Sequence, residues 1–212
     1  MSTPGNGDRR LTRRLVQLFA GLVLYGVSMA MMIRSNLGLD PWDVFHQGLS
    51  EVTGISFGWV VILVGVPVLL LWIPLRQRPG FGTIANLFVV GLAVDGGLAL
   101  LPEPGSLPFR IGYLTAGILL NGLATGLYIG SRFGPGPRDG LMTGLVNRFP
   151  RLSIRLVRTT IELTVLGAGF LLGGTAGIGT VAYAVAIGPL CHFFIPFFTV
   201  PARPVPELAS MD

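Results

Sequence analysis

Ionisable side chains stand at a few places in a sequence that is otherwise strongly apolar. Asp43 follows one long apolar run, and the pair Arg138 and Asp139 follows another. Asp95 and His192 each lie inside such a run. An ionisable group in an apolar segment costs at least a few kcal/mol unless it is paired or hydrated. Aspartate and histidine can then carry a proton or a cation, so these groups are the first candidates for function.

We interpret the polar side chains at these places as solute-binding groups, with a structural alternative for each. Asp95 and His192 could instead hydrogen-bond to a neighbouring helix, and the groups after the apolar runs could belong to amphipathic helices at the membrane interface. Arg138 could serve only to set the topology of the chain. The candidate solute-binding residues are Asn36, Asp43, Asp95, Arg138, Asp139 and His192.

Motifs of the common enzyme classes are absent from the sequence. All 15 basic residues are arginine, so a phosphate-binding loop that ends in lysine is excluded. A glycine-flanked serine nucleophile and the HExxH zinc motif are also missing. The two histidines and the scattered carboxylates show no metal-ligand spacing. We therefore expect a protein that is not an enzyme and that holds no cofactor and no metal.

Composition predicts an all-α polytopic membrane protein. The chain is 51% hydrophobic and only 12% charged, with a mean hydropathy of +0.70, whereas a soluble domain is about 25% charged. Its apolar runs are long enough to cross a bilayer as helices. Nucleic acid is not expected as a partner, because the arginines lie between apolar runs. The predicted spans are 15–33, 56–75, 81–101, 111–130, 155–173 and 177–199.

A short polar segment interrupts the apolar sequence after the first span, and a similar segment follows the fourth span. We call these two segments the polar breaks. Four residues of the first break match four of the second at one constant offset and without a gap. Gly26 and Ala30 match Gly122 and Gly126 at the same offset. Asp95 matches His192 at an offset one residue longer. The matched residues of the two breaks are Ser35, Gly38, Pro41 and Asp43 in the first, and Ser131, Gly134, Pro137 and Asp139 in the second.

Three spans in each copy would insert the second copy in the opposite orientation, as in the inverted repeats of many secondary transporters. With the amino terminus in the cytoplasm, only Arg34 and Arg110 would lie on the outer side, in agreement with the positive-inside rule. Both termini are then cytoplasmic. The predicted organisation is a basic tail at 1–14, two three-helix repeats at 15–104 and 105–200, and a second tail at 201–212.

Each break leads into a short helix. Asp40 is placed to cap a helix over 41–51, and Pro41 suits its first position. Such a helix start favours anions. Within the fifth span, Arg158 and Glu162 are spaced for an i,i+4 ion pair. The three tryptophans, Trp42, Trp59 and Trp72, are interpreted as anchors at the membrane interface.

The sequence resembles the YczE/YitT group of small bacterial membrane proteins. The resemblance rests on residues 35–43 after the first span and on residues 82–86, Gly91 and Asp95 in the third, and it covers most of residues 15–200. It implies a multi-span protein of the bacterial inner membrane, without an established substrate or catalytic residue. The chain lacks the long soluble carboxy-terminal domain of the YitT-like branch and is closer to the short YczE-like branch.

Two functions are consistent with this pattern. The first is a small secondary transporter or permease in the lipid bilayer, with a site between the repeats for a small-molecule solute, an anion being one candidate. A homodimer is considered because three spans per repeat form a thin wall around a pathway. The second is an accessory membrane protein that assists another complex or an export pathway, in which case the polar residues only support packing and topology.

Overall fold

The computed structural model describes residues 6–200, and their side chains from residue 10 onward. All regular structure in this part of the chain is α-helical. The helices are α1 (Asn6–Ser35), α2 (Pro41–Thr53), α3 (Phe57–Leu70), α4 (Phe81–Leu100), α5 (Leu107–Gly130), α6 (Pro137–Arg148), α7 (Ile154–Leu171) and α8 (Ile178–Phe198).

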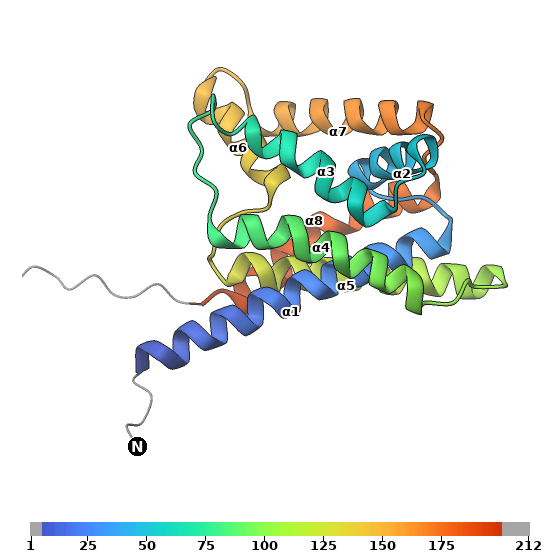
Figure 1. The fold of residues 1–212 in the computed structure, drawn as a ribbon, viewed down its shortest axis with the longest axis horizontal. Coiled ribbons are helices and arrows are strands. Elements are labelled where there is room, and N and C mark those ends of the chain that lie inside the picture. Colours follow the sequence, from blue (N-terminus) through green and yellow to red (C-terminus); the bar gives the residue numbers. More distant parts are fainter. Residues whose placement is uncertain (1–5, 201–212) are drawn as a thin grey trace, which may run out of the picture.

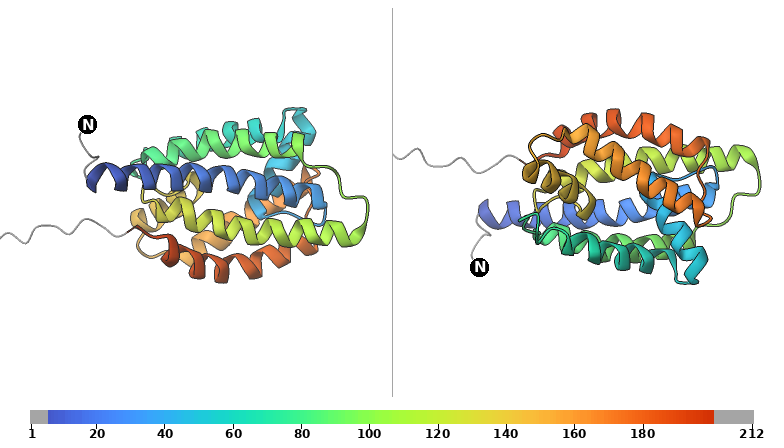
Figure 2. Two further views of the ribbon diagram at one scale, coloured as in Figure 1. Left: turned by 90° about the horizontal axis from the view of Figure 1, so that it is seen from below. Right: turned by 90° about the horizontal axis from the view of Figure 1, so that it is seen from above.

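The helices form two layers (Figure 1). In one layer α4, α1, α5 and α8 lie side by side in that order, with α1 packed along both α4 and α5 (Figure 2). The other layer contains α3 and α7, with the short helices α2 and α6 packed against them. The described chain begins and ends at the same end of this bundle (Figure 1).

Within residues 6–200, four helices are long and apolar enough to cross a membrane, namely α1 from Arg10 onward, α4, α5 and α8. Helices α2 and α3 pass the same test only together, and the chain bends by 113° between them. Many large apolar side chains point outward, among them Leu100 at 85% exposure and Phe197 at 75%. Outward apolar side chains are expected where lipid replaces water as the surrounding medium.

Helices occupy all six predicted spans, but α3 and α7 do not qualify as spans on their own. Helix α3 ends at Leu70, before the predicted boundary at residue 75. Pro74 favours the early end, because it has no N–H to donate to the Leu70 carbonyl and its ring would clash with that carbonyl in a continuing helix. Helix α7 carries Arg155, Arg158 and Glu162, and these charges lower its apolar character.

The two polar breaks adopt the same backbone conformation. Asn36 and Arg132 have positive φ angles of 49° and 58°, and Gly38 and Gly134 have φ angles of 120° and 119°. A φ angle near +120° is almost inaccessible to any residue with a side chain. Glycine is therefore required at both positions, and the match predicted from the sequence extends to the backbone.

Each break is held by an arginine from the other half of the chain. Arg14 Nε donates to the carbonyl of Ser131 at 2.8 Å, and Arg110 Nε donates to the carbonyl of Ser35 at 2.7 Å. In both cases a second guanidinium nitrogen donates to the carbonyl of the next residue. These carbonyls lie at helix ends, where no intrahelical donor remains.

The backbone N–H of a glycine in the other half donates a further hydrogen bond to each break. Gly82 N donates to the carbonyl of Phe133 at 2.9 Å, and Gly179 N donates to the carbonyl of Leu37 at 2.8 Å. A Cβ on Gly82 would lie 2.9 Å from the Phe133 Cβ, so a side chain at this position would force the two segments apart. The two halves thus satisfy each other's exposed backbone groups.

We predict that Gly38→Ala lowers the melting temperature of the purified protein in detergent. The substitution forces a side chain into a φ of 120° and places its Cβ 2.7 Å from Gly177 N and 2.8 Å from Thr180 N. Such backbone strain costs about 1–3 kcal/mol. Gly105→Ala is the matched control, because a Cβ there meets no atom within 4 Å. Equal melting temperatures for the two variants would contradict the assigned role of Gly38.

Candidate functional site

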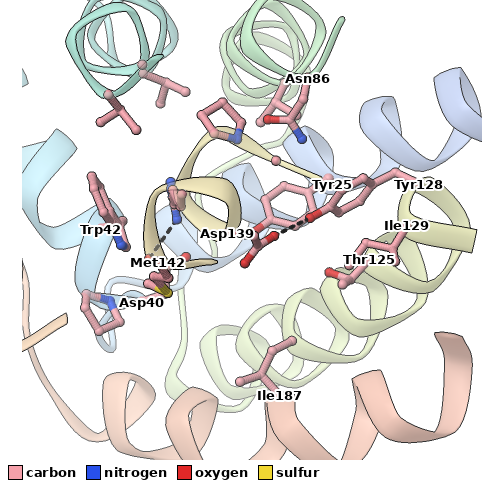
Figure 3. Close-up of a pocket in the computed structure, with 18 of the residues that line it drawn as sticks. Tyr25, Asp40, Trp42, Asn86, Thr125, Tyr128, Ile129, Asp139, Met142 and Ile187 are labelled. Atoms are coloured by element: carbon pink, nitrogen blue, oxygen red, sulfur yellow. Dashed lines mark hydrogen bonds and ion pairs between the residues drawn. The ribbon is translucent and has the colours of Figure 1, made fainter. Parts of the chain in front are cut away.

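A cavity of about 260 Å³ lies between the two layers, and residues of all eight described helices contribute to its lining (Figure 3). Part of its wall is apolar, with Val61 and Val68 on α3 and Ile187 on α8. The charged lining residues are Asp40, Arg138, Asp139, Arg158 and Glu162, and the aromatic ones are Tyr25, Trp42, Tyr128 and Tyr183, with the imidazole of His46 beside them.

The start of α2 brings two carboxylates to the cavity. Asp40 caps the helix, accepting a hydrogen bond from Asp43 N at 2.9 Å, and Pro41 occupies the first helical position. The capping helix predicted from the sequence is confirmed, and it ends at Gly54, which has a φ of 70°. Asp40 is 2% exposed and Asp43 is fully buried, so both carboxylates depend on protein groups rather than on water.

Arg138, near the start of α6, neutralises part of this charge. Its Nη2 lies 3.1 Å from Asp43 Oδ1 and its Nη1 lies 3.5 Å from Asp40 Oδ1. Its guanidinium carbon lies 5.2 Å from the centre of the Trp42 ring, within cation–π range. His46 Nδ1 also approaches Asp43 Oδ1, at 3.3 Å. The two polar breaks, far apart in sequence, therefore meet in one buried ion cluster.

Several polar atoms of this cluster have no hydrogen-bond partner. Among the described residues, the buried side-chain atoms without one include Asp40 Oδ2, Asp43 Oδ2 and Trp42 Nε1. A buried polar atom without a partner costs about 1–3 kcal/mol. The cluster can therefore accept two more hydrogen bonds and donate one more, beside the cavity.

Asp139 forms a second polar group on the cavity wall. Tyr128 Oη donates to Asp139 Oδ2 at 3.0 Å (Figure 3). The Tyr128 ring packs edge-to-face on the Tyr25 ring, with 6.1 Å between the centres. Asp139 is exposed, and these contacts hold its carboxylate beside two aromatic rings on the cavity wall.

The ion pair predicted on α7 is present. Arg158 Nε donates to Glu162 Oε1 at 2.8 Å, and both residues line the cavity. Their side chains are 57% and 31% exposed, so this pair stands at the edge of the cavity rather than deep within it.

The structure brings three of the six candidate residues together and places the other three elsewhere. Asp43, Arg138 and Asp139 belong to or adjoin the cavity. Asn36 is exposed, and its carbonyl accepts a hydrogen bond from Arg110. The other two, Asp95 and His192, do not share a site. The Asp95 carboxylate accepts from Ser56 Oγ at 2.6 Å and Gly58 N at 2.7 Å at the start of α3, whereas His192 is exposed on α8.

Sequence reasoning missed the aromatic lining. Trp42, interpreted as an interface anchor, is only 7% exposed and lies on the cavity wall. Trp72 is 2% exposed and donates from Nε1 to the Pro137 carbonyl at 3.1 Å. The anchor interpretation is wrong for these two tryptophans, whereas Trp59 is 54% exposed. One available signal was the alignment of Trp42 with Arg138 at the offset of the repeat.

The apolar helices and the outward apolar side chains define a polytopic α-helical membrane protein. The chain belongs to the Family of unknown function (DUF6198), which matches residues 12–196. This agrees with the resemblance to the short YczE-like branch, which is confirmed.

Relatives in two bacteria match most of the chain. A Haemophilus influenzae protein named "Uncharacterized protein" is 41% identical over 180 residues, 85% of this chain and 82% of its own length. The Bacillus subtilis "Uncharacterized membrane protein YczE" is 30% identical over 190 residues, 89% of this chain and 88% of its own length. The "Uncharacterized protein YyaS" of the same organism is 27% identical over 180 residues, with 83% and 89% covered. No solved structure matches the chain.

We predict that Arg138→Gln strongly destabilises the protein. The variant leaves Asp40 and Asp43 buried without their cation, and removal of one partner from a buried ion pair costs about 3–5 kcal/mol. Addition of Asp43→Asn to this variant should restore part of the loss, because it removes one of the two uncompensated charges. Thermal melting in detergent measures both effects.

Glu103→Gln is the control for the loss of an ion pair outside the cluster. It removes the partner of Arg34, but the Glu103 side chain is 81% exposed, and exposed pairs contribute only about 0–1 kcal/mol. A melting temperature for Arg138→Gln as high as that of Glu103→Gln would show that the buried cluster does not stabilise the fold.

Proposed function

We propose that this protein is a small secondary transporter or permease of the bacterial inner membrane, with its solute site in the central cavity. The observation that carries the proposal is the ion cluster, in which Arg138 from the second half reaches Asp40 and Asp43 from the first. In transporters built from inverted repeats, substrate sites lie at the interface between the repeats. A cavity with buried charges at such an interface has the expected place and chemistry. Enzymatic activity, a cofactor and a resident metal are not part of the proposal.

The proposal includes an inverted duplication of three spans. Its support is the reciprocity of contacts across the halves, since Arg14 holds the second break as Arg110 holds the first. The capping hydrogen bonds also match, with Gly80 N donating to Thr83 Oγ1 and Gly177 N donating to Thr180 Oγ1, both at 3.1 Å. Matching contacts at matching positions are expected of two copies that assemble about a common axis.

The cavity wall is less complete on the side of the second half. Helix α3 packs along α4, but α7 makes no comparable contact with α8. Gly58 and Gly65 permit the close approach of α3, because a Cβ on Gly58 would lie 2.0 Å from the Gly91 carbonyl oxygen. The aligned positions of α7 hold Arg155 and Glu162, whose side chains require more space. We propose this side as the route into the cavity, which a second copy in a homodimer would enclose.

The proposed topology predicts opposite accessibility for the ends of α2 and α6. Thr53 and Asn147 are exposed near these ends. In spheroplasts, with Cys191→Ala to remove the native thiol, a membrane-impermeant maleimide should label T53C but should label N147C only after permeabilisation. Both termini would then be cytoplasmic. Labelling of both positions from the same side would reject the inverted arrangement.

Transport by the cavity predicts that a solute stabilises the purified protein. A ligand that binds only the native state at 100 times its dissociation constant adds about 2.7 kcal/mol to the stability. A panel of small metabolites tested by thermal melting should therefore contain compounds that raise the melting temperature, and Asp139→Asn should reduce this shift. Glu51→Gln is the control, since Glu51 is exposed and lies outside the central cavity.

Uptake of the selected solute into proteoliposomes then tests transport itself. The competing function is an accessory protein that assists another membrane complex. That function would be favoured if no solute shifted the melting temperature and if neutral replacements of Asp43 and Asp139 left the cellular activity intact while surface changes abolished it.

A further inference from the structure

We infer that the cavity takes a small organic cation, a compound with an ammonium group and a neutral hydrogen-bond acceptor. This inference rests on the proposed function and specifies its solute class. It reverses the anionic solute that the sequence suggested, because the groups that could bind an anion are occupied by carboxylates of the chain itself.

The charges around the cavity are unbalanced. Asp40, Asp139 and Glu162 line it, with Asp43 beside them in the ion cluster, and the guanidinium groups among the described lining residues are those of Arg138 and Arg158. Of these carboxylates only Asp40 and Asp43 are buried, whereas Asp139 is exposed and the Glu162 side chain, paired with Arg158, is 31% exposed. The two buried carboxylates share Arg138, so within the described part of the chain one buried negative charge has no cationic partner while His46 is neutral. Burial of an unpaired charge is costly, so a bound cation would stabilise the site.

The carboxylates of α2 also have free acceptor atoms. Asp40 and Asp43 use Oδ1 for Arg138, and their Oδ2 atoms are buried without a hydrogen-bond partner in the part of the chain that the structure describes. Asp40 is 2% exposed and lines the cavity. An ammonium group is a donor only, and it would supply both the missing charge and the missing hydrogen bonds.

The aromatic lining favours the same chemistry. Tyr25, Trp42, Tyr128 and Tyr183 line the cavity, and the faces of such rings attract cations, most strongly when water is excluded. Trp42 Nε1 is buried and has no acceptor among the described residues. A hydroxyl or carbonyl oxygen on the solute would accept its hydrogen bond, which is why we specify a neutral acceptor in addition to the ammonium group.

The size and composition of the site exclude two other classes of ligand. At about 260 Å³ the cavity holds roughly nine water volumes of about 30 Å³ each, so the solute is small. Within the described residues no group of three His, Cys, Asp or Glu side chains could hold a metal ion. An anion at the start of α2 would meet the capping carboxylate of Asp40 rather than free N–H groups.

The test is a charge series on the purified wild-type protein, followed by thermal melting at constant ionic strength and pH. The probes are choline, ethanolamine and tetramethylammonium as cations, acetate and phosphate as anions, and sodium as an inorganic cation. We expect choline and ethanolamine to raise the melting temperature in a saturable manner, and tetramethylammonium, which lacks the acceptor oxygen, to do so at higher concentration. Acetate, phosphate and sodium should have no specific effect.

Variants then assign the effect to the cavity. Asp40→Asn and Asp43→Asn should each weaken choline binding at least tenfold, whereas Glu103→Gln, an exposed carboxylate outside the cavity, should leave it unchanged. Trp42→Phe removes the free N–H and retains a ring, and it should weaken choline more than tetramethylammonium. If the aspartate variants do not fold, the wild-type charge series and Trp42→Phe still decide the question.

The outcomes separate this inference from the proposed function. Stabilisation by an anion or a neutral solute that depends on Asp139 would overturn the cation assignment and retain the transporter. The same series repeated at a lower pH gives the remaining outcome. Stabilisation by acid alone, without any effect of the organic cations at either pH, would show that protons balance the carboxylates and would also overturn the inference. No response to any solute, in this series and in the metabolite panel, would reject both.

Discussion

The structure depends on one constraint, the need to satisfy polar groups that lie away from water. Helices α1 and α5 end beside the buried Ser35 and Ser131, and their last carbonyls have no intrahelical donor. Arg14 and Arg110 supply those donors across the halves, at 2.8 and 2.7 Å. Separation of the halves would remove these donors, and a buried carbonyl left without one costs about 1–3 kcal/mol. These contacts therefore fix how the two halves of the chain meet, through α1 and α5.

The same constraint determines where the ion cluster lies. Helices α2 and α6 begin directly after the two breaks, so the chain positions that follow the breaks are brought to the centre of the bundle. Asp43 and Asp139 stand at equal positions in the two short helices, yet they have different partners. Arg138 binds Asp43, whereas the Tyr128 hydroxyl binds Asp139. A scaffold of matching backbones thus carries a site whose chemistry differs from one side to the other.

The sequence alone predicted the helical membrane class, the capped start of α2, the Arg158–Glu162 pair and the matching of the breaks, because each depends on local spacing. A hydrogen bond from Asp95 to a neighbouring helix was one predicted alternative, and the structure confirms it at the start of α3. The partner could not be predicted, because the contact joins residues far apart in the chain. Burial of Trp42 was missed because an isolated tryptophan beside a proline is compatible with a membrane interface, and its packing against Arg138 also joins distant residues. The prediction of six spans stays a prediction, because α3 is short and bent sharply from α2 and passes the test for a span only together with it.

The proposed repeats differ at positions that line the cavity and agree at positions that join the halves. Glycines and hydroxyl groups that join the halves are the same in both copies, such as Gly38 with Gly134 and Thr83 with Thr180. Lining positions differ, since Trp42 aligns with Arg138 and Gly65 aligns with Glu162. A symmetric scaffold needs equal residues where the copies hold each other, but a single small solute has no such symmetry. Divergence at the lining and identity at the joints is the pattern expected when a duplicated frame acquires one asymmetric binding site.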